Sequence, residues 1–448
     1  MSKPDVLVVG AGLAGLCCAR TLRQHGVSFE ILESSDGIGG RVRTDCQDGF
    51  LLDRGFQVLL TAYPEALEQL NYEALGLRPF IPGTLIRYHG RFIRLTDPWR
   101  EPGAFLNNLF SPIGSLSDKY RIWKLRTDLM RKSIGEIFSG EETSALQALR
   151  RRGFSSRMLD SFLKPLLGGM LLDAKLTASS RMFEFAFKML SEGDTALPER
   201  GMGAIPAQLA EGLPANSIRL QTKAKSIGNK EVVLESGEIL RANSIVVATE
   251  GQEAGHLLGY SHNINSRSVS VLYFVAKEPP LDEPILVING GSRGPVNNVC
   301  VPNLVQPTYA PEGNWLVSAS VLGWPTSDDK TLVNMVRSQL RRWYGLVALE
   351  WRLLRVYRIL HALPITYPME WQQPQRVSDG LYICGDHRAT PSIQGAMESG
   401  RLAAEALLQE LGITLKPREP GPVEPKAPVI TGKGVGQGEH AGEQEADD

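Results

Sequence analysis

Short apolar runs and one stretch of helical spacing alternate at the start of the chain. Val6 to Val9 is a β-branched run that ends at Gly10, and Phe29 to Glu33 is a second apolar run. Between them, Leu13 to His25 carries apolar residues at the three- and four-residue spacing of an amphipathic helix. This order predicts a strand, a helix and a second strand, which is a βαβ unit.

The apolar pattern changes several times after this unit. A helical, loop-rich region runs from Pro64 to about Leu190 and has the character of an inserted domain. From Ile218 to Thr249, short apolar runs such as Glu231 to Leu234 predict strands that return to the first sheet. Val269 to Leu322 alternates apolar and polar residues between Gly and Pro turns, which predicts a platform sheet beside a pocket.

The C-terminal part of the chain contains one more strand, one more helix and a polar tail. Leu381 to Cys384 is predicted to be the last strand, and Gly395 to Leu411 the last helix. From about Pro417 the chain is rich in Pro, Gly, Glu and Lys, a composition typical of disordered segments. We therefore expect residues 416–448 to form a disordered tail.

The composition is that of an ordinary soluble globular protein. The 448 residues are 42% hydrophobic and 22% charged, and the formal net charge is −1. Nucleic-acid partners require a basic stripe that neutralises phosphates, so none is predicted. The length favours two or three domains.

The cysteines and the lack of long apolar segments bear on the compartment. The five cysteines are an odd number and form no C-x-x-C pair, which fits a reducing compartment and predicts no metal site. We find no secretory leader and no run of roughly 20 apolar residues. A cytoplasmic protein is expected, and attachment to a membrane surface stays open.

A glycine-rich loop joins the first predicted strand to the first predicted helix. Gly10-Ala11-Gly12-Leu13-Ala14-Gly15 follows the strand directly, which is the setting that the dinucleotide-binding fingerprint requires. Gly10 permits the tight turn, Gly12 lets the backbone approach a pyrophosphate, and Gly15 lets the helix pack closely on the strand.

Further residues complete this candidate cofactor cradle. Leu13 and Ala14 open the helix, whose N-terminus turns its positive dipole end towards the phosphates. Glu33 ends the second strand about 20 residues on, where a carboxylate accepts hydrogen bonds from ribose hydroxyls and repels a phosphorylated ribose. Gly39-Gly40-Arg41 follows, and its guanidinium can close over the pyrophosphate from the opposite side.

Four separated blocks carry a wider similarity. They are Val8 to Gly15 with Leu32-Glu33 and Gly39 to Arg41; Gly49-Phe50 with Asp53 and Gly55; Gly201 to Pro206 with Val246 to Thr249; and Gly385-Asp386 with Ser392 to Ala396 and Gly400. In this order and spacing the chain resembles the flavin-containing amine oxidase superfamily, which includes monoamine oxidases, protoporphyrinogen oxidase and the plant-type phytoene desaturases. The resemblance spans most of the chain.

The resemblance implies an α/β fold in which a Rossmann-like FAD-binding domain carries an inserted, mixed α+β substrate domain. The FAD-binding domain is expected to be discontinuous, over residues 1–80, 200–265 and 375–412. Residues 81–199 and 266–374 are expected to form the substrate domain. The FAD is expected to be non-covalent, because no cysteine falls where a covalent link would be expected.

Three more residues are expected to contact the cofactor. In the superfamily, the position that matches Ala224 meets adenine through backbone atoms. Asp386, after a strand, can hold a ribityl or phosphate-proximal hydroxyl. Ile393 lies at the start of the last helix, which directs free N–H groups at the pyrimidine edge of the flavin and stabilises negative charge on the reduced ring.

The substrate class is less well specified. Monoamine oxidases flank the flavin with two aromatic rings, and Ser392 stands at the position of one of them, which argues against an amine cage. Phe162 to Met170 and Ser179 to Phe183 resemble the corresponding stretch of phytoene desaturases, and suit a hydrocarbon tunnel and a buried helix core equally well. Ile81 to Arg126 mixes aromatic and basic residues, as an interfacial patch or an ordinary helical lid would.

The favoured reaction is hydride transfer from a C–H bond of a lipophilic substrate, of isoprenoid, carotenoid or tetrapyrrole type, to flavin N5. A quinone or dioxygen then accepts the electrons. Such chemistry rests on positioning and water exclusion, so no catalytic residue is assigned, although His387 and Arg388 are candidates for moving a proton or screening charge. Three alternatives stay open: an amine oxidase, an FAD-requiring carotenoid isomerase and a non-catalytic flavin-binding protein.

Overall fold

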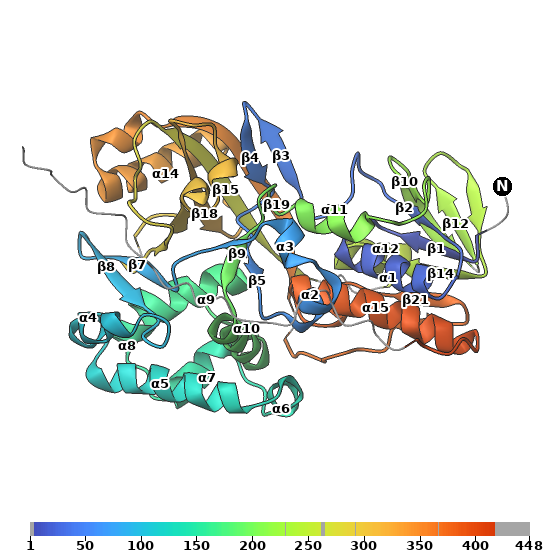
Figure 1. Ribbon diagram of the computed structural model, residues 1–448, viewed down its shortest axis with the longest axis horizontal. Coiled ribbons are helices and arrows are strands. Elements are labelled where there is room, and N and C mark those ends of the chain that lie inside the picture. Colours follow the sequence, from blue (N-terminus) through green and yellow to red (C-terminus); the bar gives the residue numbers. More distant parts are fainter. Residues whose placement is uncertain (1–3, 229, 261–264, 292, 366, 417–448) are drawn as a thin grey trace, which may run out of the picture.

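The computed structural model describes residues 4–416 except residues 229, 261–264, 292 and 366. Apart from Lys416, the tail predicted over residues 416–448 lies outside the described residues. A six-stranded sheet and a seven-stranded sheet lie towards opposite ends of the molecule (Figure 1). The chain crosses between the two sheets several times, so each contains strands from distant parts of the sequence.

The six-stranded sheet is built mainly from short, buried strands. Its order is β10-β2-β1-β14-β21-β20, and neighbouring strands run parallel except β20 with β21. In that order the strands span Ile218–Arg219, Phe29–Leu32, Val6–Val9, Ser244–Val247, Leu381–Ile383 and Arg376–Ser378. The predicted βαβ unit is confirmed, since β1 and β2 pair in parallel with Val6 beside Phe29.

Two long helices lie side by side against this sheet (Figure 1): α1 (Leu13–Gln24) and α15 (Ile393–Glu410). At Gly400 the two come so close that a Cβ would stand 2.0 Å from the carbonyl oxygen of Ala14. Only glycine allows this approach, which fixes α15 relative to α1. Each helix follows a parallel strand, so both begin at the carboxyl edge of the sheet.

A separate three-stranded antiparallel sheet covers the other face of the six-stranded sheet, together with α12 (Gly251–Leu257). Its strands are β11 (Ala224–Gly228), β12 (Glu231–Leu234) and β13 (Ile239–Arg241). The prediction that Glu231 to Leu234 returns to the first sheet is therefore wrong. The alternating apolar residues of this segment specify a buried face but not the strand that it pairs with. Val232 and Leu234 pack against Leu7 and Ile245 of the six-stranded sheet instead of pairing with a strand of it.

The seven-stranded sheet has the order β19-β15-β18-β17-β16-β7-β8. In that order its strands span Arg352–Pro364, Ser266–Ala276, Trp315–Leu322, Val296–Cys300, Leu286–Ile288, Gly83–Tyr88 and Arg91–Thr96. The platform sheet predicted between Val269 and Leu322 is confirmed. The helical region predicted after Pro64 needs correction, because the β7–β8 hairpin interrupts it and joins this sheet through parallel pairing of β7 with β16.

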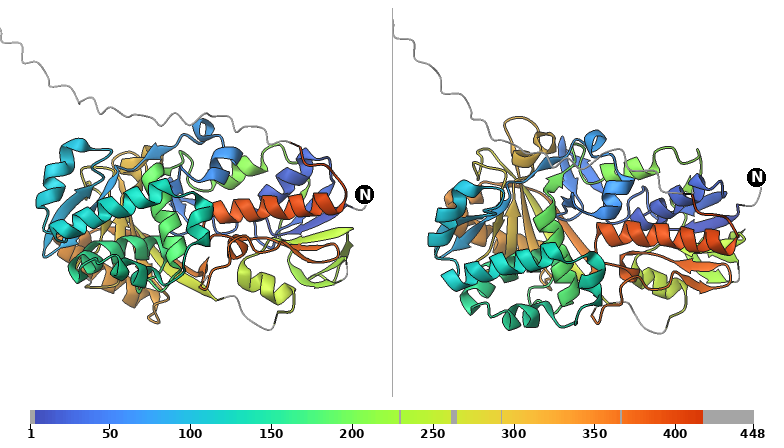
Figure 2. Two further views of the ribbon diagram at one scale, coloured as in Figure 1. Left: turned by 90° about the horizontal axis from the view of Figure 1, so that it is seen from below. Right: turned by 60° about the horizontal axis from the view of Figure 1, so that its bottom comes forward.

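Helices cover both faces of the seven-stranded sheet. α14 (Asp329–Tyr344) packs on one face. A helical layer packs on the other and forms the far end of the molecule (Figures 1 and 2). It comprises α4 (Phe105–Phe110), α5 (Leu116–Arg131), α6 (Ile134–Ser139), α7 (Ala145–Arg151), α8 (Ser156–Met158), the π-helical turn η2 (Leu159–Leu163), α9 (Lys164–Leu171) and α10 (Ser180–Glu192). Within the described part of the chain, no helix is long and apolar enough to cross a membrane.

Short elements complete the fold. They are β3 (Thr44–Gln47), β4 (Phe50–Asp53), β5 (Leu59–Leu60), α2 (Pro64–Gln69), α3 (Tyr72–Leu75), β6 (Arg78–Pro79), β9 (Thr195–Leu197), α11 (Ala204–Ala210), α13 (Pro302–Val305) and the 3-10 turns η1 (Pro102–Ala104), η3 (Pro307–Tyr309), η4 (Leu346–Leu349) and η5 (Asp386–Arg388). β3 pairs with β4, and β5 and β6 pair with β9.

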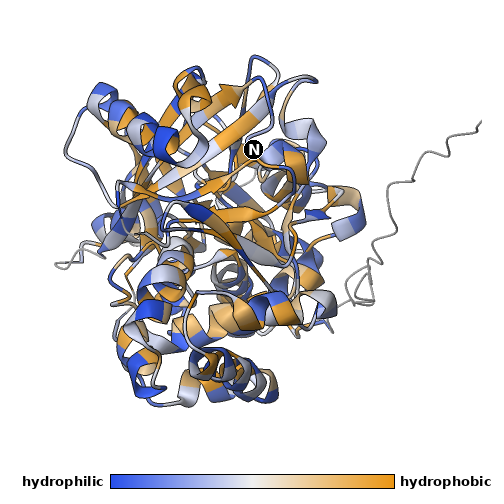
Figure 3. Cartoon of the chain, turned by 90° about the vertical axis from the view of Figure 1, so that its left-hand side faces the viewer, coloured by the Kyte–Doolittle hydropathy of each residue, from blue (hydrophilic) through white to orange (hydrophobic). Residues whose placement is uncertain are grey.

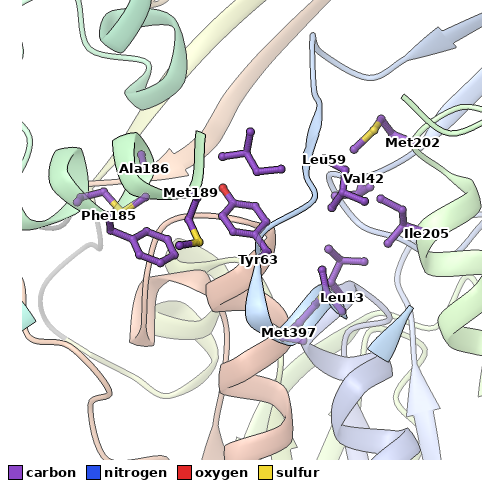
Figure 4. Close-up of a cluster of buried hydrophobic side chains, with 14 of the residues drawn as sticks. Leu13, Val42, Leu59, Tyr63, Phe185, Ala186, Met189, Met202, Ile205 and Met397 are labelled. Carbon is purple, nitrogen blue, oxygen red and sulfur yellow. The ribbon is translucent and has the colours of Figure 1, made fainter. Parts of the chain in front are cut away.

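One hydrophobic core runs through both halves of the molecule. It joins Leu13 of α1 and Met397 of α15 to Phe185 and Met189 of α10, and Tyr63 lies among them (Figure 4). The rings of Tyr63 and Phe185 stack with their centroids 6.0 Å apart. Continuous apolar packing thus holds the two halves together. The domain boundaries expected from the sequence stay a prediction, because this core crosses them.

Asp53, the last residue of β4, connects β4 to the seven-stranded sheet. Its carboxylate accepts hydrogen bonds from the Thr44 hydroxyl, the Met202 N–H and the Tyr309 hydroxyl. The Tyr273 hydroxyl of β15 donates to its backbone carbonyl at 2.9 Å. Burial raises the pKa of Asp53 to about 6, although the hydrogen bonds to its carboxylate oppose the shift.

Asp53→Asn is predicted to remove a pH dependence of stability. Unfolded, this carboxyl titrates near its ordinary pKa of roughly 3.9, whereas in the fold its pKa is about 6. The folded protein therefore holds an extra proton between these values, and the stability from it is lost as the pH rises through about 6. In urea unfolding, the wild type should lose about 2 kcal/mol relative to Asp53→Asn between about pH 4.5 and about pH 7.5.

Asp118→Asn is the control for this measurement. Burial would raise the pKa of Asp118, but hydrogen bonds from Ser155 and Ser115 lower it to about 2. The Asp118 carboxyl is therefore ionised throughout the tested range, and its replacement should cost a constant free energy of unfolding. Wild type and Asp53→Asn curves that run parallel with pH would contradict the shifted pKa of Asp53.

Candidate functional site

One large cavity extends from the carboxyl edge of the six-stranded sheet to the helical end of the molecule. Its volume is about 1150 Å³, above the roughly 300–1,000 Å³ of usual small-molecule pockets. Eleven of the twelve predicted cofactor residues line it: Gly10, Gly12, Leu13, Ala14, Glu33, Gly39, Gly40, Arg41, Ala224, Asp386 and Ile393. Segments far apart in the sequence thus converge on one site.

The three fingerprint glycines have different surroundings. Gly10 has a φ of +109°, and a Cβ there would stand 2.8 Å from the carbonyl oxygen of Ala248. A Cβ on Gly15, the predicted residue that does not line the cavity, would stand 1.9 Å from the carbonyl oxygen of Gly10. A Cβ on Gly12 would meet no atom within 4 Å. Two glycines therefore permit close backbone packing, and Gly12 leaves the cavity wall bare.

The N-terminus of α1 lies at the cavity without a capping side chain. The first N–H groups of a helix have no intrahelical acceptor, so an uncapped N-terminus is suited to bind an anion such as a phosphate. Glu33 lies beside it, because its carboxylate accepts hydrogen bonds from the N–H groups of Ala11 and Ser35, each at 2.8 Å. These bonds fix the Glu33 carboxylate at the cavity wall.

Arg41 and Asp386 form a second part of the wall. The Gly39 N–H donates to the Ala11 carbonyl at 2.8 Å, which holds this segment beside the fingerprint loop. The Arg41 guanidinium reaches Asp386 at 2.7 Å and the Ala362 carbonyl at 3.0 Å. Burial alone would lower the pKa of Arg41, but neighbouring Asp386 raises it above its usual value. A cation and an anion from distant segments are thus paired at the cavity.

The second long helix, α15, also presents its N-terminus to the cavity. Ile393, its first residue, lines the cavity. Ser392 caps the helix, since its hydroxyl accepts a hydrogen bond from the Gly395 N–H at 3.1 Å. Ser392, where the resemblance to monoamine oxidases leads one to expect an aromatic ring, therefore acts as a helix cap.

Tyr63 is a cavity residue that sequence reasoning missed. Its side chain lies at the cavity, and burial raises the pKa of its hydroxyl. The side chain of Ser392 is near enough to this hydroxyl to oppose the rise in its pKa. An aromatic surface beside Ser392 thus comes from another segment. The neighbouring Pro64 predicts the start of α2, and it gives no indication that Tyr63 lines a cavity.

The cavity wall offers the groups that a polar ligand such as a dinucleotide needs. Ala224 lies at the wall, and the neighbouring Thr222 N–H donates to the Glu33 carbonyl, so Ala224 and Glu33 lie in the same part of the cavity. Thr249 Oγ1 and Gln57 Oε1 are buried side-chain atoms without a hydrogen-bond partner in the described part of the chain, and both residues line the cavity. Buried polar atoms are normally paired, so these two atoms point to a polar ligand.

Comparison with protein families identifies the family of the chain. Residues 13–408 match the family described as flavin containing amine oxidoreductase. The chain belongs to this family. The resemblance expected from the sequence motifs is confirmed, and the flavin-containing amine oxidoreductases bind FAD.

Two curated relatives and one solved structure illustrate the range of similarity. Protoporphyrinogen oxidase 2 of Arabidopsis thaliana is 26% identical over 169 residues, which cover 38% of this chain and 33% of that protein. Polyamine oxidase 2 of the same plant is 29% identical over 258 residues, 55% of this chain and 51% of that protein. Reduced UDP-galactopyranose mutase superposes with a TM-score of 0.68 at 18% identity and covers 92% of this chain and 97% of that one. The match to the mutase shows the α/β fold alone, and the chain spans between a third and a half of the two curated relatives.

Apolar side chains from the helical layer wall the far half of this flavoprotein cavity. They include Phe162, Leu166, Met170 and Met182. Leu163 and Phe183, from the same segments, are fully buried in the core instead. One side of each helix therefore faces the cavity and another side packs in the core, so the core interpretation is confirmed for part of each segment and the hydrocarbon tunnel stays a prediction.

The far half also carries more positive than negative side chains. Within residues 81–199, the titratable side chains at the cavity wall are Asp97, Arg100, Lys119 and Arg126. Arg100 pairs with Asp194 at 2.9 Å. The Arg126 guanidinium lies 4.3 Å from the centroid of the Trp99 ring, and its Nε is buried without a partner among the described residues. No sequence pattern singled out these cations, because tertiary packing alone brings them to the cavity.

His387 and Arg388, candidates for moving a proton, do not line the cavity. Arg388 donates to the Pro374 carbonyl at 2.6 Å. Burial lowers the pKa of His387 to about 4, so its ring is neutral at neutral pH. The structure gives neither side chain a contact with the cavity. Cys384 is fully buried at the end of β21, as expected.

Gly12→Ala is predicted to weaken FAD binding and to leave the fold intact. Gly12 has a φ of −73°, which alanine adopts readily, and its methyl group would enter the cavity. Overpacking costs about 1–3 kcal/mol, which is at least about a fivefold rise in the Kd for FAD. Titration of the apoprotein with FAD measures this rise, and the free energy of unfolding of the apoprotein should change by less than about 0.5 kcal/mol.

Gly15→Ala is the matched control, since its methyl group would clash with the Gly10 carbonyl instead of the ligand. The helix α1 must then move away from β1, and the free energy of unfolding should fall by about 1–3 kcal/mol. Equal affinities of wild type and Gly12→Ala for FAD would contradict the placement of a phosphate at Gly12.

Proposed function

We propose that this chain is an FAD-dependent oxidoreductase that dehydrogenates a lipophilic substrate. When bound, FAD supplies a two-electron acceptor, which takes hydride from a C–H bond at N5 and passes the electrons to a quinone or to dioxygen. The observation that carries the proposal is the cavity itself, since the dinucleotide cradle and an apolar compartment line the same space.

The residues proposed to bind FAD are those that line the cavity, and FAD is bound non-covalently. In this proposal the phosphates lie at Gly10, Gly12, Leu13, Ala14, Gly39, Gly40 and Arg41, the ribose at Glu33, the adenine at Ala224, and the ribityl chain and flavin edge at Asp386 and Ile393. Gly15 acts indirectly, because it lets α1 approach β1 closely enough to present its N-terminus.

The chain contributes positioning and the exclusion of water. Val269, Ile288 and Ile359 of the seven-stranded sheet line the cavity together with Phe162 and Met182 of the helical layer. Apolar walls of this kind hold a reacting carbon in place and strengthen the electrostatic effect of the two helix N-termini. No side-chain base is required, so the proposal assigns no catalytic residue.

Charge in the far half of the cavity favours an acidic lipophilic substrate. Lys119 and Arg126 lie at the wall. Within the described residues Lys119 donates to the carbonyls of Leu109 and Ser111 and Arg126 to that of Ser191, and neither forms an ion pair with a carboxylate. Such cations attract the carboxylates of a tetrapyrrole, whereas a carotenoid offers them no partner. They would repel a polyamine, which is a polycation at neutral pH. We therefore favour a tetrapyrrole-type substrate, in line with the relative named protoporphyrinogen oxidase 2.

An amine oxidase is the second candidate function. The similarity to polyamine oxidase 2 supports it, and so does the ring of Tyr63 beside Ser392. Asp97 is the one acidic side chain at the cavity wall within residues 81–199, which leaves a polyamine few partners.

Anaerobic bleaching of the purified holoprotein tests the proposal. A porphyrinogen should remove the visible absorbance of the flavin and be recovered in a more oxidised form, while polyenes and polyamines should react far more slowly. Bleaching by amines alone would overturn the substrate class. A product of unchanged mass would favour an isomerase, and a flavin that stays oxidised with every class would favour a non-catalytic protein.

Arg126→Met is predicted to raise KM for a porphyrinogen and to leave kcat almost unchanged, because a carboxylate bound there lies away from the reacting carbon. Hydrogen bonds to charged groups contribute about 1.5–3 kcal/mol, so the rise should be roughly tenfold or more. Lys124→Met is the matched control, since Lys124 is exposed on the same helix and does not line the cavity. Equal KM values for the two variants would contradict an acidic substrate.

A further inference from the structure

Large apolar side chains stand exposed on α4 and α5. The exposed fractions are 62% for Leu106, 81% for Phe110, 64% for Leu116, 61% for Tyr120 and 46% for Trp123. These five residues form what we call the cap surface. It lies at the end of the molecule remote from the six-stranded sheet. This end faces the viewer in Figure 3. Clustered exposed apolar side chains usually mark an interaction site.

The helix α5 is apolar on two sides. Leu125 and Leu129 are fully buried on the side that packs against α10. Leu116, Tyr120 and Trp123 follow one another at spacings of four and three residues, so they form a second stripe. The rings of Tyr120 and Trp123 stack with centroids 5.7 Å apart. A surface helix normally turns polar residues to water, so packing within the chain does not explain the outer stripe.

Basic side chains accompany this stripe. α5 carries five basic and two acidic residues, although the formal net charge of the whole chain is −1. Lys124 and Arg131 are exposed on it. Aromatic and aliphatic side chains among lysines and arginines are typical of helices that lie in the headgroup region of anionic bilayers.

The cavity opens at the cap surface. Trp99 and Trp123 both line the cavity, and they are 39% and 46% exposed. The cavity therefore reaches solvent where these two rings lie. Ile122 and Arg126 line it from another side of α5. One helix thus contributes both to the cavity wall and to the exposed apolar surface at its mouth.

We propose that the cap surface docks on the anionic face of a lipid bilayer and that a lipophilic substrate enters the cavity directly from it. The entry route rests on the proposed function, whereas the docking does not. A second copy of the chain would explain the apolar stripe, but it would not explain the basic residues beside it. An anionic bilayer explains the stripe, the charge and the position of the cavity mouth together.

Co-sedimentation of the full-length holoprotein with vesicles tests the docking. Vesicles of phosphatidylcholine mixed with phosphatidylglycerol should carry the protein into the pellet, and added salt should weaken this binding. Phosphatidylcholine alone should bind it more weakly. Phe110→Ser should lower the partition to mixed vesicles by about tenfold or more, because a phenylalanine is no longer buried in the bilayer. Leu346→Ser on η4 is the matched control, since Leu346 is 66% exposed outside the cap surface, and it should bind like the wild type.

Three outcomes would overturn the docking. The first is that the wild type stays in the supernatant with both vesicle types. The second is that Phe110→Ser and Leu346→Ser bind vesicles equally well. The third is that sedimentation velocity shows a dimer that binds no vesicle and that the Phe110→Ser substitution dissociates. Unchanged flavin absorbance and urea unfolding check that the variants are folded. Vesicle binding is measured without turnover, so its failure leaves the proposed reaction intact, and a failure of flavin bleaching leaves the vesicle result standing.

Discussion

The site depends on close contact between backbones that have no side chain between them. Gly15 lets α1 approach the Gly10 carbonyl, and Gly400 lets α15 approach the Ala14 carbonyl. Both helices begin at the carboxyl edge of the six-stranded sheet because each follows a parallel strand, and these close contacts keep their N-termini together at one cavity. Two positive dipole ends then stabilise negative charge at two places along it.

The apolar half of the cavity is positioned by a different constraint, which is the shared hydrophobic core. Tyr63 packs among residues of α1, α10 and α15, and the Asp53 region is tied by hydrogen bonds to Tyr273 of the seven-stranded sheet and to Tyr309. Moving the two halves apart would expose this core to water, which the hydrophobic effect opposes. The distance between the glycine loop and the apolar wall is therefore set by burial.

Features determined by local geometry could be predicted from the sequence. The glycine loop, α1, β2 and the last helix are encoded by turn glycines and by helical or alternating spacing within a few residues. Features determined by long-range packing could not. The alternation in Glu231 to Leu234 specifies a buried face and not its partner strand, so the sequence predicts the wrong sheet for this segment. Tyr63 and Arg126 reach the cavity through tertiary packing, so no local pattern distinguishes them from ordinary core and surface residues.

The strand β14 contributes to the site through its place in the six-stranded sheet. It pairs with β1 on one side and with β21 on the other. The fingerprint loop and Glu33 follow the strands on the β1 side, whereas Asp386 and Ile393 follow β21, and all of them line the cavity. The width of a single strand therefore separates the two parts of the wall, and a defect in β14 would misalign them although none of these residues belongs to it.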